Sequence, residues 1–120
     1  MKSRIFVIVT ALIATLSLSA DAKSAAKAEI GRQLELLKKG EVDKLRLRFT
    51  QRQRERVTAD KVKNAQAELN NYTLDDLVAS VIEDTYKDQK TIKIKMKNGR
   101  TLTTLVQQGG EWYADTIWFR

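Results

Sequence analysis

Two tight-turn signals near the C-terminus constrain the fold more than any other feature of this chain. Asn98-Gly99 and Gly109-Gly110 each supply residues that accept the positive φ angles of two-residue hairpin loops. The segments around them are rich in Ile, Thr, Leu, Val, Trp and Phe, which suit a pleated surface. Residues 91–120 therefore predict a three-stranded antiparallel meander.

The first strand of this meander alternates strictly, with Ile92, Ile94 and Met96 on one face and three lysines on the other. This pattern is typical of a sheet with one buried face. It places Trp112 and Trp118 on the face of Ile92, where core packing is their simplest role. If both loops contain two residues, the expected pairs are Lys97 with Arg100, Ile94 with Thr103, Ile92 with Leu105, Leu105 with Ala114, and Gln107 with Trp112.

The opposite face of the last two strands is more apolar than a solvent-exposed face should be. Either a bulge at residues 107–110 changes the register, or both faces are covered, by a helix or by a partner subunit. The second alternative predicts an interaction face that binds a homodimer partner or an envelope protein. Its residues are Leu102, Val106, Tyr113, Ile117 and Phe119.

The first 22 residues have the pattern of a secretory signal peptide. Lys2 and Arg4 precede an apolar run over residues 5–18, and Ala20-Asp21-Ala22 offers small residues to a signal peptidase. We expect a signal peptide at 1–22 and a mature domain at 23–120, with cleavage after Ala20 as the alternative. The run is short for a bilayer span of about 20 residues. We therefore expect a secreted or periplasmic protein without a stable membrane anchor.

Removal of residues 1–22 lowers the net charge from +7 to +6, because two basic residues and one acidic residue are lost. The remaining chain is long enough for one small domain. It contains no cysteine, so core packing must stabilise it without disulfides.

Apolar spacing predicts helices before the meander, at residues 25–39, 41–49 and 59–70. Gly40 is a natural C-terminal stop, and Thr58 and Thr73 are good N-caps. After Thr73 two interpretations compete. One is a helix over residues 74–83, and the other is a short helix to residue 79 followed by a strand over 81–86 that turns at Lys87-Asp88.

An arginine-rich run over residues 45–57 begins inside the second predicted helix and ends before the third. It could bind an envelope polyanion such as lipopolysaccharide. Helical spacing scatters these arginines around the axis, and pairing with nearby carboxylates is the simpler interpretation. No aromatic residues interleave with the later ones, and export argues against cellular nucleic acid, so no nucleic acid is expected. The residues are Arg46, Arg48, Arg52, Arg54 and Arg56.

Three stretches of the chain resemble small exported domains of the cystatin-like superfamily, relatives of nuclear transport factor 2 and the SnoaL-like proteins. They are LLKKGEVDKLRLRFT (36–50), KIKMKNGRTLTTLV (93–106) and GGEWYADTIW (109–118). The resemblance implies an α+β fold in which N-terminal helices pack on a curved antiparallel sheet of three to four strands. It favours the strand over residues 81–86. In some members the cone holds a pocket, which would here be lined by Trp112, Trp118, Met96 and Leu69.

The absence of histidine and cysteine excludes thiol catalysis, histidine-based triads and ordinary zinc sites. Asp115 and Tyr113 remain as a catalytic pair, but a surface aspartate beside the lysine ladder is the simpler interpretation of Asp115. We therefore predict no catalytic residues, no metal and no cofactor. The expected function is a non-enzymatic exported binding or interaction domain. The alternatives are a small-ligand binder with an apolar pocket and a binder of envelope polyanions.

Overall fold

In the computed structural model the chain forms an α+β fold, and the structure describes the backbone of residues 2–119 and the side chains of residues 21–119. Most of the predicted signal peptide, residues 1–20, lies outside the described side chains. The helices are α1 (Lys2–Lys39), α2 (Val42–Arg46), α3 (Ala59–Glu68) and α4 (Leu74–Leu77), with 3-10 helices at Gln51–Arg56 and Leu69–Asn71. The strands are β1 (Ser80–Tyr86), β2 (Gln89–Lys95), β3 (Thr101–Gln108) and β4 (Glu111–Ala114).

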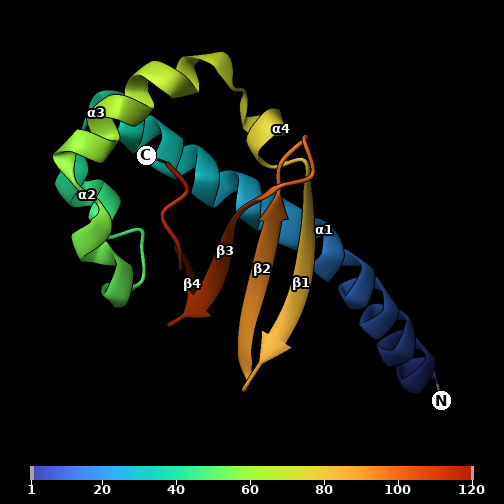
Figure 1. Cartoon of the computed structure of the whole chain (residues 1–120). Helices are drawn as coiled ribbons and strands as arrows, with labels where there is room; N and C mark the ends of the chain where they lie inside the picture. Colours follow the sequence, from blue (N-terminus) through green and yellow to red (C-terminus); the bar gives the residue numbers. More distant parts are fainter. Residues whose placement is uncertain (1, 120) are drawn as a thin grey trace.

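The four strands form one open antiparallel sheet in the order β1-β2-β3-β4. Helix α1 crosses one face of this sheet, and α2 and α3 lie beyond the β4 side (Figure 1). The predicted α+β fold, with helices packed on an antiparallel sheet of up to four strands, is confirmed.

Helix α4 is short, and a strand follows it. Thr73 and Asp76 form a reciprocal capping box at its start, but the helix ends at Leu77. Strand β1 then pairs with β2 along its whole length through a turn at Lys87 and Asp88, whose φ angles are 49° and 65°. The interpretation of residues 74–83 as one helix is therefore wrong, because the ladder with β2 supplies the backbone hydrogen bonds that a helix would form locally.

The register of the last three strands follows most of the predicted pairs. Ile94–Thr103, Ile92–Leu105, Leu105–Ala114 and Gln107–Trp112 are all observed. The expected pair of Lys97 with Arg100 is wrong, because the β2–β3 register shifts between Ile94 and Lys95, so that Lys95 faces Thr101. The irregularity thus lies in the β2–β3 hairpin. Strands β3 and β4 pair without interruption up to Gln108 and Glu111, on either side of the turn at residues 109–110.

Two of the predicted helices end earlier than expected. Helix α2 stops at Arg46 instead of Phe49, because the next residues run beside β4 as a single parallel bridge between Phe49 and Ala114. Ala114 N donates to Arg48 O (3.0 Å), and Thr50 N donates to Ala114 O (2.9 Å). Helix α3 ends at Glu68 and tightens into a 3-10 turn. Helix α1 ends as predicted before Gly40, which has a φ of 72°.

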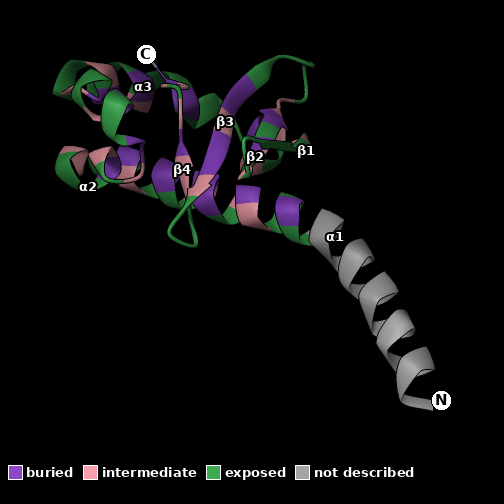
Figure 2. Ribbon diagram, turned by 90° about the horizontal axis from the view of Figure 1, so that it is seen from below, coloured by how far each residue is buried: buried purple, intermediate pink, exposed green. Residues whose placement is uncertain are grey.

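The core lies between α1 and the sheet (Figure 2). The stripe of α1 formed by Ala26, Ile30 and Leu37 is fully buried, and Ile94 and Leu105 are fully buried on the sheet. The spacing of four and seven residues on α1 places these side chains on one helical face, and the alternation on β2 does the same for the sheet.

The predicted interaction face is largely closed by the chain itself. Strand β4 ends at Ala114, so Ile117 and Phe119 do not extend it. Phe119 turns into the core, with its ring centroid 5.9 Å from that of Phe49. Leu102 and Val106 are also buried within the single chain. Tyr113 and Ile117 are half-buried, and the expected continuous apolar surface is therefore absent among the described residues.

Candidate functional site

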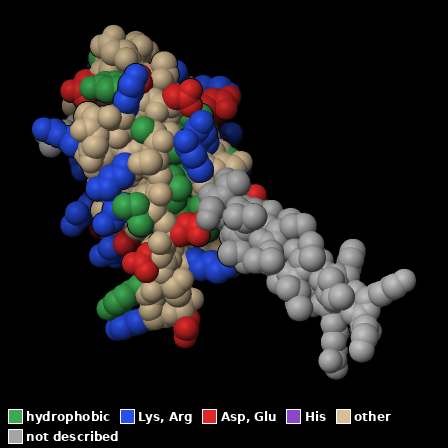
Figure 3. All heavy atoms as spheres, turned by 90° about the vertical axis from the view of Figure 1, so that its right-hand side faces the viewer, with side chains coloured by type: hydrophobic (Ala, Val, Ile, Leu, Met, Phe, Trp, Pro, Cys, Tyr) green, Lys and Arg blue, Asp and Glu red, His purple; other side chains and the backbone are tan. Residues whose placement is uncertain are grey.

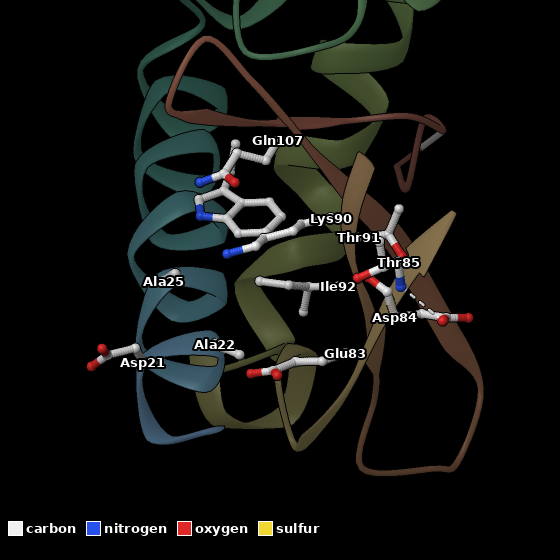
Figure 4. A pocket seen from close by; sticks show the side chains of 11 residues that line it. Asp21, Ala22, Ala25, Glu83, Asp84, Thr85, Lys90, Thr91, Ile92 and Gln107 are labelled. Carbon is white, nitrogen blue, oxygen red and sulfur yellow. Dashed lines mark hydrogen bonds between the residues drawn. The ribbon is translucent and has the colours of Figure 1, made fainter. Parts of the chain in front are cut away.

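A cavity of about 630 Å³ lies between α1 and the sheet, toward the β1–β2 turn (Figure 4). Ala22 and Ala25 of α1 form one wall, and Glu83 of β1 lies across from them. Every strand contributes to the lining, which includes Lys90 and Ile92 of β2, Gln107 of β3 and Trp112 of β4.

Small side chains on α1 open this space. Farther along the helix, Ile30 and Leu37 fill the distance to the sheet, whereas Ala22 and Ala25 are too short to do so. On β2 the alternation continues, but the residue two positions before the buried Ile92 is the exposed Lys90. The apolar core therefore ends at Ile92, and the cavity begins there.

The cavity combines an apolar floor with a polar rim, and seven of its eleven lining residues are polar or charged. Ile92 and the half-buried Trp112 supply apolar and aromatic surface. In Figure 4, Lys90 and Ile92 point toward α1 and Glu83 points toward Ala22, whereas Asp84 points away. A small-molecule site usually has about 300–1,000 Å³ and a mostly apolar lining with a few polar groups. This arrangement suits an amphipathic small molecule.

Of the four residues predicted to line a pocket, the structure places one in this cavity, Trp112. Leu69 is buried in the core at the end of α3, and Met96 is half-buried beyond the end of β2. Trp118 packs edge-on against Phe119, and its indole Nε1 donates to Gln33 Oε1 (2.7 Å). Sequence analysis missed Lys90 and Glu83. The period of two on β2 already placed Lys90 on the face of Ile92, opposite the lysine ladder.

A buried ion pair joins α1 to the segment that bridges β4. Glu29 is 3% exposed, and its carboxylate accepts hydrogen bonds from both Nε (2.9 Å) and Nη2 of Arg48. Gln33 Nε2 (2.9 Å) and Arg32 Nη1 (3.1 Å) donate to the same carboxylate. The hydrogen bond that Arg48 donates to Glu29 raises the pKa of Arg48 against the opposing effect of burial. The group is fully paired, which identifies it as a structural connection.

Four of the five arginines in the arginine-rich run donate hydrogen bonds to other groups of the same chain. Arg48 binds Glu29, and Arg52 binds Asp115. Arg46 Nε donates to Val57 O (2.8 Å), and Arg54 Nε donates to Phe49 O (3.2 Å). Arg56 is exposed. These arginines therefore point in different directions. Arg46 and Arg54 bond to backbone carbonyls within the segment between α2 and α3. Arg48 and Arg52 join this segment to α1 and to the end of β4.

Asp115 lies in an ion pair at the end of β4. Arg52 Nη2 (2.6 Å), Arg52 Nε (3.0 Å) and Thr50 Oγ1 (2.8 Å) donate to its carboxylate. The hydrogen bond from Arg52 lowers the pKa of Asp115 below its ordinary value, against the opposing effect of burial. The hydrogen bond from Thr50 lowers this pKa further, by a smaller amount. A base that works near neutral pH needs a raised pKa, so this geometry favours a structural role for Asp115.

We expect the Asp115→Asn substitution to reduce the acid sensitivity of the fold. Because the pKa of Asp115 is lower in the folded than in the unfolded chain, the ionised carboxylate stabilises the fold above about pH 4. That stabilisation is lost as the pH falls through the lowered folded value. Urea unfolding from pH 6 down to pH 2 should show a shallower decline for Asp115→Asn. A slope for Asp115→Asn equal to that of the wild type would contradict the assignment.

Neither a metal site nor a membrane-spanning helix is found in the described part of the chain. No group of three or more acidic side chains comes together there in a way that could hold a metal ion. None of the helices, searched over the same residues, has the length and apolar character needed to cross a bilayer. Comparison with known proteins gives no match to any family model, curated protein or solved structure. The resemblance to the cystatin-like superfamily therefore stays a prediction.

Proposed function

We propose that this protein is an exported, non-enzymatic domain that binds a small amphipathic molecule in the cavity between α1 and the sheet. The observation that carries the proposal is the cavity itself, with its floor of Ile92 and Trp112 and the charged Lys90 and Glu83 beside it. The apolar part of a ligand would lie on Trp112 and Ile92. Its polar end would meet Lys90, Glu83 or Gln107.

The N-terminal pattern supports export, and the site of cleavage matters for the cavity. Ala22 is buried and forms part of its wall. Cleavage after Ala20 would keep this wall, whereas cleavage after Ala22 would remove it and widen the mouth. The binding experiment should therefore use protein purified with its natural N-terminus, identified by mass spectrometry.

The two tryptophans allow a direct binding measurement, because only Trp112 lines the cavity. The Trp118→Phe variant leaves Trp112 as the single indole. We expect energy transfer from it to 1-anilinonaphthalene-8-sulfonate, an amphipathic aromatic anion, with a micromolar Kd. Lys90→Gln should weaken this binding about fivefold or more, because it removes the cation at the site. Titration followed by fluorescence gives both values.

Two matched variants separate cavity binding from adsorption to a basic surface. Lys63→Gln removes the same charge from an exposed site on α3 and should bind like the parent. Ala25→Leu should fill part of the cavity and abolish binding. If the probe binds Ala25→Leu as tightly as the parent, or if both lysine variants weaken equally, the cavity is not the binding site.

A further inference from the structure

Strand β1 is the open edge of the sheet. The other edge, β4, is covered at Ala114, which exchanges backbone hydrogen bonds with Arg48 and Thr50, and Arg48 Nη2 donates to Trp112 O (3.4 Å). Within residues 2–119 no strand pairs with the outer side of β1. Two large apolar side chains of β1 face solvent, Ile82 (51% exposed) and Tyr86 (66% exposed). An exposed edge with apolar side chains is a template for pairing with another chain.

The turn geometry fixes which backbone groups of β1 are free. The two-residue loop at Lys87 and Asp88 has positive φ at both positions, so its closing pair, Tyr86 and Gln89, exchanges hydrogen bonds. Even-numbered residues of β1 therefore direct their backbone groups to β2. The backbone N–H and C=O groups of Val81, Glu83 and Thr85 point outward.

We propose that two copies of this chain pair their β1 strands antiparallel, around a twofold axis that passes beside Ile82. Val81 would then lie opposite the partner subunit's Glu83 and exchange both hydrogen bonds with it. The symmetric pair does the same, which gives four backbone hydrogen bonds. Ile82 would face the partner subunit's Ile82 in a non-hydrogen-bonded pair, on the sheet face turned away from α1. The exposed isoleucine thereby gains an apolar partner.

Charge disfavours two of the other registers that keep the free backbone groups paired. A twofold axis at Glu83 or Asp84 would place two carboxylates directly opposite each other, which destabilises a strand pair. With the axis at Ile82, Asp84 lies opposite the partner subunit's Ser80. In each chain Lys95 pairs with Ser80 from β2, on the same face. In the single chain its Nζ donates to Thr101 Oγ1 of β3 (3.0 Å), so the side chain would have to turn past the small serine to reach the incoming aspartate.

The distribution of charge around the edge fits this arrangement. Figure 3 looks toward the side of the molecule on which β1 forms the edge, and basic and acidic side chains lie next to each other on it. Because only one edge of the described sheet is open, two copies would consume both free edges and close the assembly. The result is a dimer with one continuous sheet, and growth into a fibre is blocked.

Disulfide trapping tests the register, because the chain contains no cysteine of its own. A non-hydrogen-bonded antiparallel pair has Cα atoms about 4.5 Å apart, within the range that a disulfide spans. We expect Ile82→Cys to form a covalent dimer under mild oxidation. Tyr86→Cys, equally exposed on the same face but outside the overlap, should stay largely monomeric on a denaturing gel. Preferential trapping of Tyr86→Cys or Glu83→Cys would overturn the proposed register.

Light scattering tests the dimer itself, and it does not depend on the ligand. We expect the wild-type protein to be dimeric at about 100 μM. Ile82→Lys should raise the dimer Kd at least tenfold, because two lysines would then face each other, whereas Tyr86→Lys carries the same charge change and should not. A wild-type monomer at this concentration, or equal effects of the two substitutions, would overturn the proposal.

Discussion

Replacing Glu29 with alanine is expected to lower the free energy of unfolding by about 3–5 kcal/mol, because it leaves a largely buried arginine without its partner. Arg48 is 16% exposed, and Glu29 is its principal carboxylate partner, since Glu111 lies 3.9 Å away at an exposed site. The remaining acceptor for its guanidinium is Trp112 O at 3.4 Å. Urea unfolding at pH 7, monitored by far-UV circular dichroism, measures the change.

A matched glutamate on the same helix provides the control. Glu35 pairs with Lys39 at 3.0 Å, but both side chains are more than half exposed. Exposed pairs of this kind contribute about 0.3–0.5 kcal/mol, so Glu35→Ala should change stability little. Replacing Glu29 and Arg48 together with leucine should recover part of the loss, because no uncompensated charge stays buried. A loss below about 1 kcal/mol for Glu29→Ala would contradict the assigned role of the ion pair.

Replacing Phe49 with alanine should cost about 3–5 kcal/mol, the range for deleting a buried phenylalanine side chain. Phe49 is fully buried, and its ring meets Phe119 edge-on. Its backbone also forms the bridge to Ala114, so collapse around the vacated space is restrained. The midpoint of urea unfolding should fall while the slope with denaturant stays unchanged.

Leu47 provides a comparison two residues away. Its side chain is 58% exposed, so Leu47→Ala should change stability by less than about 0.5 kcal/mol. If the two substitutions cost the same, Phe49 does not anchor this segment to the sheet. A changed slope would instead indicate that the loss of Phe49 alters the compactness of one state.

Local rules predicted the elements that depend on local contacts. The turn residues at 98–99 and 109–110 and the alternation on β2 gave the last three strands and most of their pairs. The caps at Thr58 and Thr73 bond as expected, to Lys61 N and Asp76 N. These features depend on neighbours a few residues away, which is why one sequence was enough to predict them.

Contacts distant in sequence decided the rest. Residues 74–82 carry apolar side chains at helical spacing, and only the ladder with β2 selects the strand after α4. The bulge between Ile94 and Lys95 has no glycine to mark it in the sequence. Beyond the end of β4, the Asp115 carboxylate is held by Thr50 and Arg52, which lie 65 and 63 positions away in the sequence. The cavity depends on the distance between α1 and the sheet, which no local pattern gives.

The hydrogen bond from Trp118 to Gln33 determines when the fold can be completed. The two residues are 85 positions apart in the sequence. Glu29, on the same helix, likewise lacks its partner until Arg48 has been made. Because a chain is made from its N-terminus, α1 exists long before the last strand and the C-terminal segment that cover it. The core can close only after nearly all of the chain has emerged. Until then the apolar stripe of α1 has no sheet to pack against, and it lacks the tertiary contacts that supply most of a helix's stability.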